Sequence, residues 1–148
     1  MTSSTFNEDE LRAQIVALAK TYLGVPWRHQ GRTKYGIDCV GLPSTVGKQL
    51  GLHDYPDDVN YQKISVGADL FKPFEEHCNR IRNLADLKPG DIVIFKDPVF
   101  PQHVGLMSSN VNVIHAKVTR RKVVEEPLVG DFRSRLLRGY RFKVFSNE

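Results

Sequence analysis

The first regular pattern of apolar residues predicts a helix from Glu8 to Leu23. Its apolar side chains recur every three or four residues, the spacing that gathers them on one helical face; they are Leu11, Ile15, Leu18, Ala19 and Tyr22. Asn7 is the expected N-cap, and Glu10 completes a capping-box-like pair with it. Gly24 and Pro26 are expected to end the helix.

The middle of the chain holds less periodicity. Val25 to Ile37 is rich in glycine and charge, so we expect a loop that leads into the residues around Asp38. A second helix should follow and end near Gly51. His53 to Val66 is predicted to be irregular, and Asp69 to Arg80 to form a short helix.

The pattern changes to that of β-strands after the turn signal Lys88-Pro89-Gly90-Asp91. The predicted strands are Ile92 to Phe95, Val104 to Met107, Val111 to His115, Val118 to Glu125 and Tyr140 to Phe145. Helices followed by an antiparallel sheet predict an α+β fold with the early helices packed on one face of the sheet. No repeat or Gly/Ser-rich linker divides the chain, so we expect one domain over residues 1–148.

The composition excludes several classes of protein. A chain of 148 residues can bury a core without disulfides, and two cysteines are too few for a disulfide scaffold. No apolar stretch approaches the roughly 20 residues that span a bilayer, so membrane insertion is not expected. The N-terminal residues lack the pattern of a secretory signal, which predicts synthesis in the cytoplasm without a signal peptide.

The net charge of +4 is unevenly distributed. From Lys117 onward lie nine of the 21 basic residues but only four of the 17 acidic ones. Such a segment could meet an anionic polymer, either nucleic acid or cell wall. Apolar residues are interspersed among these charges and no nucleic-acid motif accompanies them, so we interpret the segment as a solvated sheet face and expect no nucleic-acid partner.

Cys39 has the most informative surroundings of any candidate residue. It follows Asp38, a good N-cap, and so falls near the first turn of the second predicted helix, where backbone N–H groups favour a thiolate. Gly41 would let a substrate backbone approach, and the Cys39 N–H could bind an oxyanion. Pro43 implies a distorted or later first turn, and the charge of Asp38 opposes ionisation of the thiol. A nucleophile and a small apolar filler both remain possible.

Two histidines join this picture through their strands. His103 begins one predicted run and His115 ends the next, and a turn at Ser108 to Asn110 would make the two runs a hairpin. Taken singly, each histidine is expected to be an ordinary surface or core residue. Together with Cys39, they supply the nucleophile, the base and the orienting group that nucleophilic catalysis requires.

A zinc site is the competing use of the same residue types, and it fits poorly. Structural zinc sites present paired ligands a few residues apart, and the sequence has no such pair. We therefore expect no metal and no cofactor. Cys78 is interpreted as a small apolar filler, and His29, His53 and His77 as ordinary surface residues.

Five short blocks then carry a resemblance to a known family. In chain order they are Tyr22-Leu23-Gly24-Val25-Pro26-Trp27, Ile37-Asp38-Cys39-Val40-Gly41-Leu42, Leu87-Lys88-Pro89-Gly90-Asp91-Ile92-Val93, His103-Val104-Gly105-Leu106 and Ile114-His115-Ala116. Together they resemble the NlpC-type cell-wall cysteine peptidases over most of the chain. The resemblance implies a papain-like α+β fold with Cys39 as nucleophile, His103 as general base and His115 as the residue that orients it. It also implies hydrolysis of an amide bond in bacterial peptidoglycan stem peptides, commonly between D-glutamate and a diamino acid.

Two positions depart from the family pattern. Val40 stands where a serine usually follows the cysteine, and Trp27 where a tyrosine is common. These family positions help to hold the stem peptide, so Trp27, Val40 and the adjoining Asp38 are the expected substrate-binding residues. The Asp-Cys-Val-Gly variant looks most like the phage-encoded branch, found among tail-associated proteins. With no export signal, this resemblance predicts a virion-tail location, action on the bacterial cell wall or periplasm, and phage tail proteins as partners.

Other functions fit the same residues. Pro43 and Val40 are compatible with a structural tail or adaptor protein that keeps the scaffold without activity. The same three residues also fit an antibacterial secreted effector, an acyltransferase or a peptidase that acts on proteins.

Overall fold

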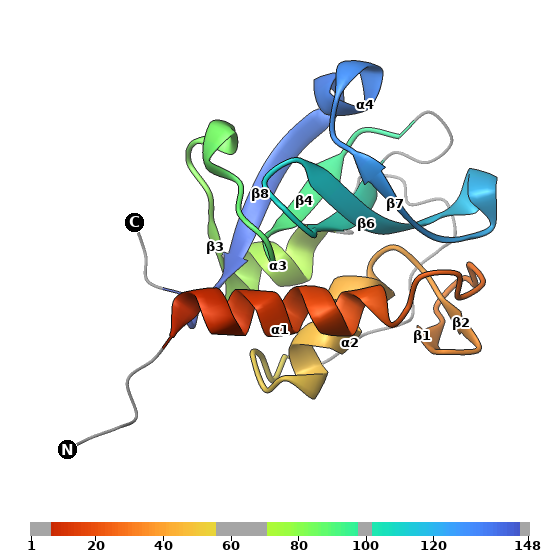
Figure 1. Cartoon of the computed structure of the whole chain (residues 1–148), viewed down its shortest axis with the longest axis horizontal. Helices are drawn as coiled ribbons and strands as arrows, with labels where there is room; N and C mark the ends of the chain where they lie inside the picture. The colour runs from red at the N-terminus through yellow and green to blue at the C-terminus, as the bar shows by residue number, and fades with distance from the viewer. Residues whose placement is uncertain (1–6, 56–70, 98–101, 146–148) are drawn as a thin grey trace.

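The computed structural model describes residues 7–55, 71–97 and 102–145. Its helices are α1 (Glu8–Lys20), α2 (Gly41–Gln49), α3 (Lys72–His77) and α4 (Gly130–Ser134), with 3-10 turns η2 (Leu84–Asp86) and η3 (Val118–Arg120). Its strands are β1 (Arg32–Thr33), β2 (Gly36–Ile37), β3 (Cys78–Arg80), β4 (Ile92–Phe95), β5 (His103–Met107), β6 (Asn112–Lys117), β7 (Lys122–Pro127) and β8 (Leu136–Phe142). A six-stranded antiparallel sheet runs in the order β3-β8-β4-β5-β6-β7 (Figure 1).

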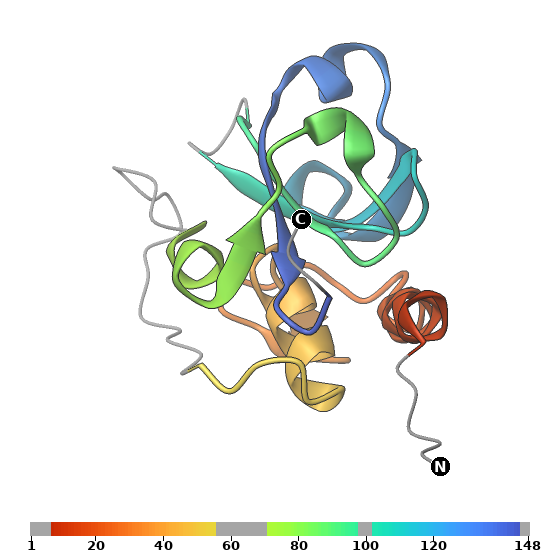
Figure 2. The same ribbon diagram turned by 90° about the vertical axis from the view of Figure 1, so that its left-hand side faces the viewer.

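Alternation along the central strands builds the core on both faces of this sheet. Residues such as Ile94, Leu106 and Ile114 join a cluster with the buried faces of α1 and α2. Their strand neighbours, such as Val93 and Met107, join a second cluster on the opposite face. Figures 1 and 2 show α1 and α2 side by side beneath the sheet. The predicted α+β fold, with its early helices on one sheet face, is therefore confirmed.

Helix α1 begins where the sequence predicts it. The Asn7 side chain accepts a hydrogen bond from the Glu10 N–H at 3.0 Å, as the capping prediction requires. The helix ends at Lys20, three residues before the predicted end, because the next amides bond carbonyls only three residues back. No helix in the described part of the chain is long and apolar enough to cross a membrane.

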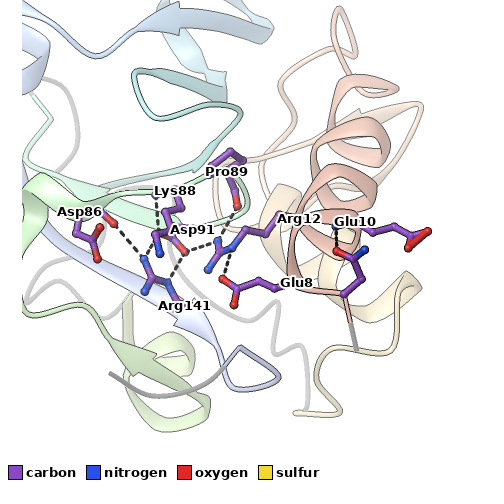
Figure 3. Close-up of polar contacts among 9 residues, drawn as sticks. Glu8, Glu10, Arg12, Asp86, Lys88, Pro89, Asp91 and Arg141 are labelled. Carbon is purple, nitrogen blue, oxygen red and sulfur yellow. Dashed lines mark hydrogen bonds and ion pairs between the residues drawn. The ribbon is translucent and has the colours of Figure 1, made fainter. Parts of the chain in front are cut away.

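A buried ionic network joins α1 to the sheet (Figure 3). Asp91, completely buried before β4, accepts hydrogen bonds from the Lys88 N–H, from Arg12 and from both Nε and Nη2 of Arg141, at 2.8–3.1 Å. Arg12 also donates to the Pro89 carbonyl at 2.7 Å. The turn signal of the sequence therefore anchors a helix and a strand that are distant from it along the chain.

Three predicted elements differ in the structure. Cys78 to Arg80, predicted as the end of a helix, forms strand β3 because it pairs with β8, from Cys78 opposite Phe142 to Arg80 opposite Tyr140. Val118 to Arg120, predicted as strand, forms η3 and lets the chain reverse between β6 and β7. Strand β8 begins at Leu136, four residues before the prediction.

The remaining differences lie in the middle of the chain. The loop predicted from Val25 to Ile37 contains the short antiparallel pair β1–β2. Of the stretch predicted as irregular, residues 53–55 are irregular as expected. Residues 56–66 of that stretch, and 69–70 of the predicted short helix, lie outside the described residues.

The ionic network predicts a large effect on stability from a nearly isosteric change. Asp91→Asn removes the negative charge while Arg12 and Arg141 stay buried, so the free energy of unfolding should fall by about 3–5 kcal/mol. Urea denaturation followed by circular dichroism measures this change. The control is Asp131→Asn, which removes an exposed ion pair with Arg135 and should cost less than about 1 kcal/mol. Equal effects of the two substitutions would contradict the assigned role of Asp91.

Candidate active site

Cys39 lies immediately before helix α2. The helix begins at Gly41, and Pro43 occupies its third position, where a missing N–H breaks no intrahelical bond. The Asp38 carboxylate accepts a hydrogen bond from the Gly41 N–H at 2.8 Å, and the Asp38 carbonyl accepts one from Leu42. Of the two arrangements that Pro43 allowed, the structure has the later start of the helix.

The Asp38 carboxylate also holds the β1–β2 hairpin against this helix start. It is buried and accepts hydrogen bonds from the Gln30 N–H at 2.8 Å and from Arg32 at 2.9 Å. Gly41 makes this approach possible, since a Cβ there would lie 2.6 Å from the Gly31 carbonyl oxygen. The space that we expected Gly41 to leave for substrate is therefore filled by the chain's own backbone. A role of Asp38 in substrate binding stays a prediction.

Trp27 and Val40 are the other expected substrate-binding residues. Trp27 is half-buried against the core, and its backbone N–H bonds the Arg121 carbonyl at 2.9 Å, which ties this segment to the turn before β7. It also bridges to Ile37, two residues before the cysteine. The Val40 side chain is buried in the core. Their contacts with a substrate stay predictions.

His103 and His115 meet, as the predicted hairpin requires. They lie on strands β5 and β6, and His103 Nε2 is 2.6 Å from His115 Nδ1 in a buried hydrogen bond. The turn between the strands falls at the predicted residues, 108–110. Gly105 allows the strands to approach, since a Cβ there would lie 2.5 Å from the Val113 side chain and 3.5 Å from the His115 Cβ.

Glu126 is the site residue that sequence reasoning missed. From β7, its Oε2 is 2.7 Å from His115 Nε2 and 3.1 Å from Lys117 Nζ. The Phe132 ring stacks on His115 with 5.2 Å between centroids. Glu126 pairs with Val113 in the sheet, so it lies on the same face as His115, two residues along. Glu126 could have been identified only from the register of the β6–β7 pair, and the sequence of a single strand does not reveal that register.

Two backbone N–H groups and one carboxylate link Cys39 electrostatically to the strands around this cluster. The N–H groups of Val40 and of Val104, the residue after His103, hydrogen-bond the sulfur and act to lower the pKa of the thiol. The Asp97 carboxylate, just after β4, acts to raise the pKa of both Cys39 and His115. The structure therefore brings Cys39 close to the strand that carries His103.

Burial decides the resting protonation of these groups. It raises the pKa of the Cys39 thiol to about 12, with the Asp38 charge as the next cause, so the expected thiolate at the helix start is not the resting form. Burial, then the charges of His115 and Lys117, hold the pKa of His103 well below 6.5. The resting pair is therefore a thiol beside a neutral imidazole.

The other candidate residues lie apart from this cluster. Cys78 is buried in the core, as the filler interpretation predicts. His53 and His77 both stack on Tyr55, with ring centroids 3.7 and 4.9 Å from it. His77 is exposed, as expected of a surface residue, whereas His53 is half-buried and its Nε2 lies 2.8 Å from the Ser44 carbonyl oxygen. Within the described ranges, no group of three or more histidines, cysteines and acidic residues is arranged to hold a metal ion.

The helix-and-sheet arrangement, with a cysteine before a packed helix and a histidine on a neighbouring strand, defines a papain-like α+β fold. The NlpC domain of the peptidoglycan hydrolase SagA has this fold, with a TM-score of 0.66 and 22% identity over 88% of this chain and 97% of that one. NlpC2 from Trichomonas vaginalis gives a TM-score of 0.68 and 23% identity over 94% of this chain and 48% of that one. The model of the NlpC/P60 family matches residues 24–141, and the chain belongs to this family.

Curated relatives are similar over a shorter part of their own length. Murein DD-endopeptidase MepS/Murein LD-carboxypeptidase of Escherichia coli K12 is 26% identical over 78% of this chain and 54% of that protein. The probable endopeptidase NlpC of the same strain is 27% identical over 68% of this chain and 58% of that protein. The chain thus spans little more than half of the length of these relatives.

The protonation of the site predicts slow alkylation of Cys39. Because the thiolate is the nucleophile and the pKa is raised to about 12, iodoacetamide should modify Cys39 more slowly at neutral pH than it modifies a free cysteine peptide. The rate should keep rising between about pH 7 and 10 without a plateau. Mass spectrometry of the Cys39 peptide over time measures it. A rate that is constant across this range would indicate a preformed thiolate and contradict the assignment.

Proposed function

We propose that this protein is a cysteine peptidase that hydrolyses an amide bond in the stem peptides of bacterial peptidoglycan. The observation that carries the proposal is the 2.6 Å hydrogen bond between His103 and His115. His103 lies on strand β5, and the N–H of the next residue on that strand, Val104, reaches the Cys39 sulfur. This arrangement offers a nucleophile, a base and an orienting group from three different elements.

In the first step, the Cys39 sulfur attacks the carbonyl carbon of the scissile amide. Its proton passes to Nδ1 of His103, because Nε2 of that ring is engaged with His115. The Cys39 N–H is our candidate donor to the oxyanion that forms. His103 then protonates the amide nitrogen, the C–N bond breaks, and the amine leaves behind a thioester on Cys39.

In the second step, His103 accepts a proton from water as the water oxygen attacks the thioester carbon. The C–S bond breaks, the carboxylic acid product leaves, and the proton returns to sulfur. The resting thiol and neutral imidazole are thereby restored. The low pKa of His103 favours the step in which the ring releases its proton to the leaving amine. The first transfer, from a thiol whose pKa is raised to about 12, is uphill, so it must accompany formation of the bond between sulfur and the carbonyl carbon.

Family membership and the names of the curated relatives support peptidoglycan as the substrate. Val40 adjoins the cysteine in the sequence, and Trp27 bridges to Ile37, two residues before it. Both stand where the chain departs from the usual pattern, so we propose that they set which stem peptide fits. A phage tail as the setting, with tail proteins as partners, rests on the resemblance of the Asp38-Cys39-Val40-Gly41 sequence alone.

Removal of the nucleophile tests the proposal directly. Cys39→Ala should abolish release of products from purified muropeptides, because the alanine side chain has no nucleophilic atom to take the place of the sulfur. Liquid chromatography with mass spectrometry measures the products and identifies the bond that is cut. Cys78→Ala is the matched control and should keep activity, since Cys78 packs in the core. Full activity of Cys39→Ala would overturn the proposal, as would an inactive wild-type protein.

The burial of the base predicts the pH dependence. Because the pKa of His103 lies well below 6.5, the neutral base persists as the pH falls past the usual titration range of histidine. The acid limb of kcat/KM should therefore lie below pH 6.5. Initial rates with a soluble muropeptide across the acid range measure it. A limb at or above that value would show that the base is more exposed than the structure indicates.

A further inference from the structure

The side chains of His103, His115 and Glu126 form a row of hydrogen bonds. Glu126 has no part in the proposed mechanism, which uses only Cys39, His103 and His115. Glu126 Oε2 lies 2.7 Å from His115 Nε2, and the other nitrogen of that ring contacts His103 at 2.6 Å. Both histidines are buried, whereas the Glu126 side chain is 27% exposed. The carboxylate therefore ends the row on the side of solvent.

The charge of Glu126 is held in place by its neighbours. Burial acts to raise the pKa of its carboxyl, but hydrogen bonds from Lys117 and His115, together with the positive charge of Lys117, outweigh this effect and lower the pKa. Lys117 Nζ lies 3.4 Å from Oε1 and 3.1 Å from Oε2. At neutral pH, Glu126 is thus an ionised carboxylate, which accepts hydrogen bonds and donates none.

An acceptor at the end of the row determines every proton along it. Burial lowers the pKa of His115, so its ring is neutral at neutral pH and carries one proton. That proton must sit on Nε2 in order to donate to Glu126, so Nδ1 has none. His115 Nδ1 is then an acceptor, and His103 Nε2 must carry the proton between the two rings. His103 Nδ1 is consequently left without a proton, as a base toward Cys39 must be.

We propose that Glu126 is a positioning residue that sets the tautomers of His115 and His103, and through them the nitrogen that acts as base. The proposal rests on the proposed function in calling His103 a base. A donor at the position of Glu126 would reverse the row: His115 would donate from Nδ1, and His103 would carry its proton on Nδ1. That tautomer cannot accept a proton from the thiol.

The tautomers can be read without a substrate. Nitrogen-15 NMR of the labelled full chain at neutral pH should show both His103 and His115 protonated at Nε2 and unprotonated at Nδ1. In Glu126→Gln the amide can donate or accept, so at least one of the two rings should show a mixture of tautomers. Glu125→Gln is the matched control: the Glu125 carboxylate accepts from Ser108 at 2.6 Å, so this change should leave both rings as in the wild type.

Kinetics on a muropeptide form the second readout. Glu126→Gln should lower kcat by roughly tenfold or more with KM unchanged, because the residue acts through His115 and touches no substrate. Glu125→Gln should leave both constants unchanged. Wild-type protein with a proton on Nδ1 of either ring would overturn the proposal, and so would Glu126→Gln with wild-type tautomers. The expected tautomers in a protein that cleaves no muropeptide would support the role of Glu126 and overturn only the proposed function.

Discussion

The buried carboxylate of Asp91 is the interaction on which the rest of the arrangement depends. It receives hydrogen bonds from Arg12 on α1 and Arg141 on β8, immediately before β4 begins. Strand β4 lies between β8 and β5, so the register at its start also fixes where His103 stands. A charge cluster that takes no part in the proposed chemistry thus sets the frame in which the two histidines meet. Two buried guanidinium groups make its loss costly.

Local pattern was sufficient for much of the fold. The cap at Asn7 and the β5–β6 hairpin follow from periodicity and turn signals, because those elements obtain their hydrogen bonds from near neighbours in the sequence. Strand β4 follows from its own run of apolar residues after the turn signal, although it pairs with the distant β8 as well as with β5. Strand β3 could not be predicted in this way, since Cys78 to Arg80 is extended only through its pairing with β8, some 60 residues further along the chain. Long-range pairing overrode the local helical preference there.

The residues of the candidate site differ in the same way in how far the sequence predicts them. His103 and His115 could be brought together from the sequence because a short turn joins their strands. Glu126 could not, because its place beside His115 depends on the register of β7. The charge state of Cys39 could be predicted only in part: the sequence shows a helix start that favours the thiolate and an Asp38 charge that opposes it, but not the burial that tertiary packing imposes and that has the largest effect.

A thiol that rests protonated has a consequence for the lifetime of the protein as well as for its reaction. Peroxides attack the thiolate, and the first oxidised product, the sulfenic acid, leads on to forms that no ordinary reductant restores. Because burial and the Asp38 charge keep the Cys39 sulfur protonated, peroxide should oxidise it more slowly than it oxidises an exposed thiolate. The packing before α2 thus favours a sulfur that resists oxidation over one that is always ionised.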